Sequence, residues 1–166
     1  EILKDGAKYR RRVIITDSVF SMDGDCAPLQ EIVALARRYD TLVMIDEAHA
    51  FGVLGENGRG LAEHLGVENV IDIQMGTLSK AAGTFGAYCC GSSSLIELVL
   101  NRARSFVYTT GLPPSVAAAG CRAVEIMTQE PERRLQLLKN ARYVHDGLKN
   151  LGLNIMDSQT PIIPVV

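Results

Sequence analysis

The sequence predicts an α/β fold with a mostly parallel sheet that carries helices on both faces. Apolar runs alternate along the chain with segments of helical periodicity, and these runs are continuous rather than interrupted by polar residues. Continuous apolarity is typical of strands that are buried on both faces, as in parallel sheets. Strands are expected at residues 12–16, 41–45, 70–73 and 85–90, and residues 105–110 form a further strand-like run.

Helices are expected between these strands and over the C-terminal part of the chain. Pro28 suits the first turn of a helix, and apolar residues follow it at helical spacing. Three neighbouring serines, the first of which is Ser92, offer N-caps for another helix. Further helices are expected at residues 61–66, 115–128 and 131–151.

The composition of the 166 residues is that of an ordinary globular protein, with 47% hydrophobic residues, 22% charged residues and a net charge of −2. This charge gives no electrostatic reason to expect nucleic acid or an anionic membrane as a partner. No apolar run reaches the roughly 18 residues of a membrane-spanning helix. The four cysteines form no Cys-x-x-Cys pair, so we expect buried, reduced thiols of a cytoplasmic protein without a metal site.

The first and last residues of the sequence suggest the expectation that the chain is a piece of a longer protein. The residues from Glu1 onward do not resemble a signal peptide. The last five residues, Ile-Ile-Pro-Val-Val, resemble the first half of a strand.

Reactive side chains follow three of the expected strands. Asp46 and His49 come directly after the second strand. Ser21 follows the first strand, and Lys80 follows the third. Because ligands of parallel sheets bind beyond the carboxyl ends of the strands, these side chains are expected to meet at one edge.

Lys80 stands among Thr, Ser, Ala and Gly residues, which is unusual for a surface lysine. Such a lysine can hold an aldehyde as a Schiff base, as in enzymes that use pyridoxal phosphate (PLP). Partial burial among small residues would favour the unprotonated amine that this chemistry needs. The alternative is a solvated lysine in a loop after a strand.

Asp46 and His49 each allow two interpretations. Asp46 is either a helix cap or ion-pair partner, or the acid that keeps a pyridinium nitrogen protonated. His49 is either satisfied by backbone groups or contacts the same ring. The combined spacing, Asp-x-x-His with a lysine 34 residues after the Asp, is more specific than either piece.

Two other enzyme classes are excluded because the sequence lacks a motif that each of them needs. The Asp-Glu-Ala-His run occurs in helicases, but no Gly-x-x-x-x-Gly-Lys-[Ser/Thr] loop precedes it. The His-Glu-x-x-His pattern of zinc proteases is also missing from the sequence.

Taken together, the motifs resemble those of the α-oxoamine synthases, fold-type I PLP enzymes that condense an amino acid with an acyl-CoA and release carbon dioxide. The matching segments include Ser-Val-Phe-Ser-Met-Asp-Gly-Asp (18–25), Ile-Asp-Glu-Ala-His (45–49), Gly-Thr-Leu-Ser-Lys (76–80) and Arg-Ser-Phe-Val-Tyr-Thr-Thr-Gly (104–111). The resemblance implies the aspartate aminotransferase-like fold. It places the later part of the PLP-binding large domain at residues 1–129 and the beginning of the small domain at 130–166.

The resemblance also implies roles for individual residues. Lys80 would carry the cofactor and move protons at the substrate Cα, and Asp46 would pair with the pyridine nitrogen. Ser21 and His49 would contact the ring substituents, and Thr77 would help to hold the phosphate. Thr109 and Thr110 would reach the phosphate of a neighbouring subunit, because the family builds its site at a homodimer interface; the alternative for both is an ordinary strand residue.

The implied reaction is a decarboxylative condensation, with L-alanine and a pimeloyl thioester as the expected substrates and biotin synthesis as the expected context. Branches of the family that join glycine or serine to other acyl-CoA thioesters stay open. A different class of function also stays open, namely a catalytically silent fragment or regulatory subunit. Lys80 counts against it, because a non-catalytic relative would be expected to lack this lysine.

Overall fold

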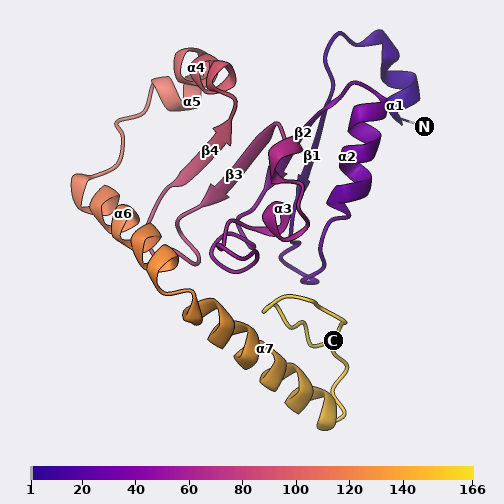
Figure 1. Ribbon diagram of the computed structural model, residues 1–166, viewed down its shortest axis with the longest axis vertical. Helices are drawn as coiled ribbons and strands as arrows, with labels where there is room; N and C mark the ends of the chain where they lie inside the picture. Colours follow the sequence, from indigo (N-terminus) through magenta and orange to yellow (C-terminus); the bar gives the residue numbers. More distant parts are fainter. Residues whose placement is uncertain (1) are drawn as a thin grey trace.

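A computed structural model describes residues 2–166, so Glu1 lies outside the described part of the chain. One four-stranded sheet has the order β1-β2-β3-β4 (Figure 1), with β1 (Val13–Asp17), β2 (Leu42–Asp46), β3 (Ile73–Thr77) and β4 (Ala87–Gly91). The first three strands pair in parallel, and β4 pairs antiparallel to β3. The mostly parallel α/β sheet expected from the sequence is confirmed.

Helical segments connect the strands and make up most of the second half of the chain. They are α1 (Ile2–Asp5), η1 (Gly6–Lys8), α2 (Leu29–Arg38), α3 (Leu61–His64), η2 (Glu68–Val70), α4 (Ser93–Arg102), α5 (Arg104–Val107), α6 (Pro114–Gln129) and α7 (Glu132–Asn150). The expected cap of α4 is present, because the Ser92 hydroxyl accepts a hydrogen bond from the backbone N–H of Leu95 at 3.3 Å.

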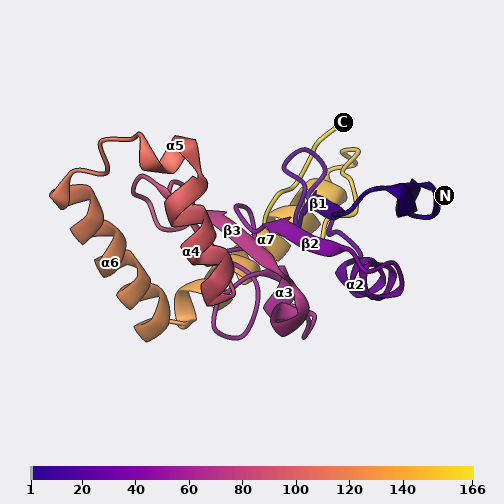
Figure 2. The same ribbon diagram turned by 90° about the horizontal axis from the view of Figure 1, so that it is seen from above.

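The hydrophobic core lies on the side of the sheet that α2 and α3 cover, as Figure 2 shows. Alternate residues of β2, Val43 and Ile45, point to this side and are almost completely buried. Leu29 and Val33 of α2 and Leu61 of α3 pack in the same cluster. Burial of such side chains is the main favourable term that holds these helices on the sheet.

The opposite side of β1 is open within residues 2–166. Val13 and Ile15 point to this side and keep 45% and 69% of their surface exposed. The side chains that alternate with Val43 and Ile45 along β2, Asp46 among them, point to the same side. The Asp46 side chain therefore lies on the face opposite the core.

The expected third strand was misplaced. Residues 68–70 form the short helix η2, and the strand begins only at Ile73. Ile71 is apolar because it is buried in the core, with 8% of its surface exposed, rather than because it belongs to a strand. The true strand includes Gln74 and Gly76, which weaken the apolar signal.

The prediction of a strand-like run at residues 105–110 is also wrong. Residues Arg104–Val107 form the short helix α5, in which the backbone N–H groups of Phe106 and Val107 both donate to the carbonyl of Ala103 at 2.9 Å. β-branched and aromatic residues favour a strand only where a neighbouring strand accepts them, and no strand of the described sheet lies beside this run.

All four cysteines are free, as expected, but their expected burial is wrong. Cys89, Cys90 and Cys121 are exposed, and Cys26 is half-buried. Two of them lie on β4, an edge strand of the described sheet. Burial and the nearby charges of Asp25 and Glu47 raise the pKa of the Cys26 thiol.

The C-terminal part of the chain passes beyond the carboxyl ends of β1 to β3 (Figure 1). Arg134 of α7 is buried, and its guanidinium donates hydrogen bonds to the backbone carbonyls of Met127 at 2.7 Å and Glu56 at 2.8 Å. The hydroxyls of Ser158 and Thr160 both donate to the carbonyl of Gly24, at 3.0 and 3.1 Å. The expected domain boundary between residues 129 and 130 coincides with the junction of α6 and α7 and stays a prediction.

Within residues 2–166, no helix has the combined length and apolarity needed to cross a membrane.

The exposed side of β1 predicts self-association of the isolated 166-residue chain. Exposed apolar surface next to a free strand edge favours contact between copies. Sedimentation velocity at micromolar concentrations is expected to show oligomers, and Ile15→Lys should shift them toward monomer. A wild-type chain that stays monomeric at these concentrations would refute this prediction.

Candidate active site

The parallel pairing brings the carboxyl ends of β1, β2 and β3 to one edge. Asp17, Asp46 and Met75 occupy equivalent levels on the three strands. The ladder continues past them, because the backbone N–H of Ser18 donates to the carbonyl of Asp46 at 2.9 Å and that of Glu47 donates to Met75 at 2.8 Å. The segments that follow these strands therefore start side by side.

Asp46 is the last residue of β2 and is half-buried. Its Oδ1 accepts a hydrogen bond from the backbone N–H of Ala48 at 2.8 Å, which fixes the carboxylate against the following turn. Within residues 2–166, Oδ2 has no hydrogen bond and Asp46 has no salt bridge. One carboxylate oxygen is thus available to a ligand.

His49 lies in the tight turn after Asp46 and is half-buried. The turn is closed by the backbone N–H groups of Ala50 and Phe51, which donate to the carbonyl of Glu47 at 2.9 and 2.8 Å. In the described part of the chain, the imidazole has no hydrogen-bond partner. The interpretation in which backbone groups satisfy His49 therefore finds no support.

Thr77 ends β3, and its hydroxyl organises the loop that carries Lys80. It donates to the carbonyl of Gly86 at 3.1 Å and accepts from the backbone N–H of Ser79 at 3.1 Å. The hydroxyls of Thr77 and Ser79 lie 2.7 Å apart. This direct link to Ser79 was not expected from the sequence, because it depends on how the chain reverses between β3 and β4.

Lys80 itself is exposed, so its expected partial burial is not found in this chain. Its loop is closed by two backbone hydrogen bonds, Leu78 N–H to Gly86 at 2.9 Å and Thr84 N–H to Leu78 at 2.9 Å. The Thr84 hydroxyl also donates to the carbonyl of Val116 in α6 at 3.4 Å. The lysine therefore projects from a loop whose base is held in place.

The loop that begins at Glu47 and carries His49 (the His49 loop, residues 47–60) is in direct contact with the loop at residues 78–86 that carries Lys80 (the Lys80 loop). A Cβ atom built on Gly52 would lie 2.8 Å from Cβ of Ala81 and 2.8 Å from Cε of Met127, so these groups pack against the bare glycine backbone. Gly52 has φ 76°, a conformation that glycine adopts without strain. Since Ala81 is adjacent to Lys80, this contact brings the two predicted motifs together.

Ser21 lies in the loop after β1 at the same edge and is exposed. The loop is closed by Phe20 N–H to the Asp25 carbonyl at 3.0 Å and by Gly24 N–H to the Phe20 carbonyl at 2.9 Å. Thr109 and Thr110 are exposed in the connection between α5 and α6. Leu112, later in the same connection, lies against Gly86 at the base of the Lys80 loop, since a Cβ built on Gly86 would be 3.1 Å from Cδ1 of Leu112.

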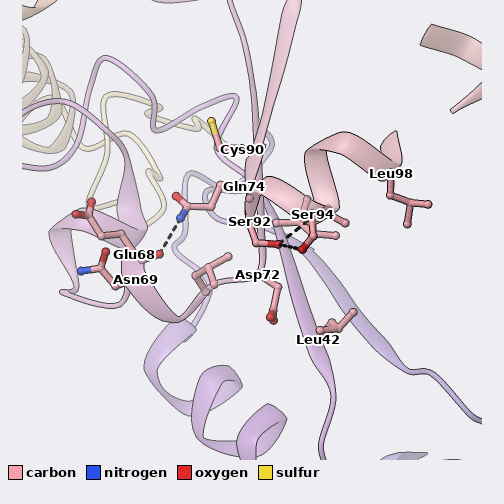
Figure 3. Close-up of a pocket in the computed structure, with 13 residues that line it drawn as sticks. Leu42, Glu68, Asn69, Asp72, Gln74, Cys90, Ser92, Ser94 and Leu98 are labelled. Atoms are coloured by element: carbon pink, nitrogen blue, oxygen red, sulfur yellow. Dashed lines mark hydrogen bonds between the residues drawn. The ribbon is translucent and has the colours of Figure 1, made fainter. Parts of the chain in front are cut away.

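Two cavities within residues 2–166 are lined by residues other than Asp46, His49 and Lys80. A cavity of about 710 Å³ (Figure 3) is bounded by the beginnings of β2 and β3 and by the N-terminus of α4, at the opposite edge of the sheet from Lys80. Its polar contacts are internal: Gln74 donates to the carbonyl of Glu68 at 2.8 Å, and the hydroxyls of Ser92 and Ser94 lie 3.3 Å apart.

A second cavity, of about 350 Å³, lies beside Tyr88 on the core-facing side of β3 and β4, and Glu47 and Phe51 also line it. The rings of Phe51 and Tyr88 make an edge-to-face contact at 5.0 Å. Burial is the largest cause that raises the pKa of the Tyr88 phenol well above its ordinary range. The negative charges of Cys90, Glu47 and Asp46 raise it further. Tyr88 is therefore neutral at physiological pH.

Comparison with known proteins places these motifs in a family. A family model described as aminotransferase class I and II matches residues 1–166. The 8-amino-7-oxononanoate synthase of Symbiobacterium thermophilum is 50% identical over 166 residues, which cover 99% of this chain and 42% of that protein. The corresponding protein of Bacillus pumilus is 49% identical, with coverage of 100% and 42%. The chain thus spans about two fifths of the length of these relatives.

Solved structures of related proteins have the same fold. A serine palmitoyltransferase from S. paucimobilis, solved with a bound PLP–myriocin aldimine, superposes with a TM-score of 0.91 at 34% identity, covering 99% of this chain and 44% of that one. An 8-amino-7-oxononanoate synthase from Francisella tularensis superposes with a TM-score of 0.76 at 28% identity, covering 95% and 47%. The aspartate aminotransferase-like fold expected from the sequence is confirmed.

The contact between the His49 loop and the Lys80 loop predicts that a methyl group added at Gly52 destabilises the fold. Gly52→Ala introduces a Cβ into the space filled by Ala81 and Met127 at a positive φ, and is expected to lower the free energy of unfolding by about 2 kcal/mol or more. Gly66→Ala is the matched control, because Gly66 has φ 68° but nothing within 4 Å of the added atom. Urea denaturation of both variants measures the difference. Equal losses would mean that the loops do not touch.

Another prediction concerns pH and the glycine-rich loop after His49, which spans residues 52–60. Burial raises the pKa of Glu63, but hydrogen bonds from Arg59 and Asn57, and the charge of Arg59, outweigh it and hold the pKa below its ordinary value of 4.5. A lowered pKa in the folded state adds stability above the ordinary pKa, and this stability is lost as the pH falls through the folded value.

Glu63→Gln is therefore expected to lower the free energy of unfolding at neutral pH by about 1 kcal/mol or less, because the pair is largely exposed. The difference from wild type should shrink as the pH falls below 4.5. Denaturation series at neutral and acidic pH measure it, and a difference that grows on acidification would contradict the assignment.

Proposed function

Because the chain belongs to the class I and II aminotransferase family, we propose that it is part of a PLP-dependent α-oxoamine synthase. The proposed reaction condenses L-alanine with a pimeloyl thioester and releases carbon dioxide, which is the step that yields 8-amino-7-oxononanoate for biotin synthesis. Relatives with that name at 47–50% identity support this choice of substrates.

The observation that carries the proposal is the contact of the His49 loop with the Lys80 loop beyond the carboxyl ends of β2 and β3. It gathers a carboxylate, an imidazole, an amine and a hydroxyl at one edge, and Asp46 Oδ2 has no hydrogen-bond partner within residues 2–166. This donor set fits PLP, which offers a pyridine nitrogen, a phenolic oxygen, an aldehyde and a phosphate.

When bound, PLP supplies an electron sink for the bond-breaking steps at the amino-acid Cα. The free carboxylate oxygen of Asp46 would hold the pyridine nitrogen in its protonated form, and Ser21 and His49 would bind the phenolic oxygen. Thr77 would bind the phosphate, which requires its hydroxyl to exchange one of its contacts in the loop. The amine of Lys80 would be the attachment point and would take and return the proton at the substrate Cα.

Thr109 and Thr110 would complete the phosphate site of a second subunit, so the proposed enzyme is a homodimer with shared active sites. Their exposure agrees with a role in trans. The four free cysteines agree with a cytoplasmic location.

A second candidate function keeps the chemistry and changes the substrates. The solved serine palmitoyltransferases, at 34–36% identity, support an enzyme that joins serine to a longer acyl-CoA. The higher identity to the 8-amino-7-oxononanoate synthases of Symbiobacterium thermophilum and Bacillus pumilus, 50% and 49%, favours L-alanine. Assaying the full-length enzyme with both pairs of substrates distinguishes the two.

The test of the proposal is the chemistry of Lys80 in the full-length protein. Added PLP is expected to give an absorbance band near about 420 nm that borohydride abolishes, with the reduced label on Lys80. Lys80→Ala should leave the unfolding free energy within about 0.5 kcal/mol of wild type, since an exposed lysine adds little packing, and should abolish turnover. Lys139→Ala, which removes another exposed lysine, is the control and should retain both the absorbance band and the turnover. Condensation activity in Lys80→Ala, or a label on another lysine, would overturn the proposal.

A further inference from the structure

Glu47 stands between Asp46 and His49, the two residues expected to do chemistry, but has no part in the proposed reaction. Its side chain points to the core-facing side of β2, opposite that of Asp46, and only 1% of its surface is exposed. A carboxylate this deeply buried is costly unless several donors satisfy it.

Three donors surround the Glu47 carboxylate. Oε2 accepts from the Ser18 hydroxyl at 2.6 Å and from the backbone N–H of Leu61 at 3.0 Å. Oε1 accepts from the backbone N–H of Ala62 at 2.9 Å. All three partners donate to it, and the contact with Ser18 is as short as charge-assisted hydrogen bonds usually are. The ionised form of Glu47 therefore fits this place.

The chain folds closely over this carboxylate. A Cβ built on Gly60 would lie 2.5 Å from the carboxylate carbon, and Gly60 has φ 126°, which side chains other than that of glycine rarely adopt. The glycine-rich loop is closed onto itself by the backbone N–H of Gly52, which donates to the carbonyl of Gly58 at 2.7 Å. The carboxylate thus joins the end of β1, the end of β2 and the beginning of α3.

The backbone of Glu47 holds the turn that carries the proposed site. Its carbonyl accepts from the backbone N–H groups of Ala50 and Phe51, and its neighbour Asp46 binds the backbone of Ala48. A shift of Glu47 would therefore move both the Asp46 carboxylate and the His49 ring.

We propose that Glu47 is a positioning residue, whose buried carboxylate fixes the Asp46–His49 turn against Ser18 and the start of α3. This inference deepens the proposed function and rests on it for the role of Asp46 and His49. Glu47 touches no reacting atom in this arrangement. It acts through the turn.

Replacement by the isosteric amide has a defined defect. In Glu47→Gln, the amide oxygen can replace only one of the two carboxylate oxygens, and the NH₂ group then faces a backbone N–H of Leu61 or Ala62. Either orientation leaves one backbone donor opposed by another donor. The turn must move to relieve this conflict.

The experiment compares three variants of the full-length protein. Glu47→Gln tests the proposal. Glu63→Gln is the chemical control, because Glu63 also accepts backbone N–H groups of the same glycine-rich loop, from Asn57 and Arg59, but does not contact the turn. Val33→Ala is the stability control, since Val33 is 5% exposed in α2 and lies in the same core.

Two quantities are measured besides melting temperature: the dissociation constant of PLP, and the NMR shift of the His49 ring Cε1–H in the protein without PLP. Glu47→Gln is expected to raise the dissociation constant at least tenfold and to move the His49 signal. The two controls should keep the dissociation constant within twofold and the signal in place, even where Val33→Ala melts at the same temperature as Glu47→Gln. Equal effects in Glu47→Gln and either control would overturn the proposal.

Two further outcomes are also decisive. If Glu47→Gln does not fold, Ser18→Ala removes one donor and keeps the carboxylate, and it should raise the dissociation constant at least threefold; no change would overturn the proposal. If the wild-type protein binds no PLP, the proposed function fails, and the His49 signal in Glu47→Gln alone decides the role of Glu47.

Discussion

The parallel pairing of β1, β2 and β3 is the constraint on which the rest of this structure depends. It places Asp17, Asp46 and Met75 at one level, so the segments after three strands begin at a single edge. Residues that lie far apart along the chain, such as Ser21 and Lys80, come to the same edge because of it. An antiparallel arrangement of these strands would send alternate strand ends to opposite edges and separate the motifs.

The reversal of the chain between β3 and β4 forms the loop that carries Lys80, which the parallel strands alone do not provide. A hairpin loop returns the chain along β3 and presents Lys80 from a base held by Thr77, Gly86 and α6. The same loop then packs against the bare backbone of Gly52, just after His49. A base held by hydrogen bonds under an exposed amine suits the role proposed for Lys80, because the side chain can move while the base keeps its contacts.

The sequence predicted the parts of this arrangement that depend on local patterns. β1 and β2 lie within one residue of their expected positions, and the residues of β2 that face α2 and α3, Val43 and Ile45, are buried. The motifs around Asp46, His49 and Lys80 were expected at strand ends and are found there. The strand at Ile73–Thr77 was displaced because Ile71 owes its apolar character to the core rather than to strand pairing.

The features that the sequence did not predict are non-local. Helix α5 replaced an expected strand because no neighbouring strand accepts that run. The burial of Glu47 depends on Ser18, Leu61 and Ala62, which approach only after the glycine-rich loop has folded. The backbone conformation of Gly60 allows Leu61 and Ala62 to approach Glu47. The only local sign of this contact in the sequence is a glycine immediately before a short helix.

In the proposed enzyme, Asp46 and Lys80 hold opposite ends of one PLP ring. A crystal structure of the full-length protein with PLP tests this arrangement most directly. We expect the Asp46 carboxylate within hydrogen-bonding distance of the pyridine nitrogen, with Lys80 bonded to the cofactor at the other side of the ring. A separation of more than roughly 15 Å between the Asp46 carboxylate and Lys80 Nζ, with no space for a ring between them, would contradict it.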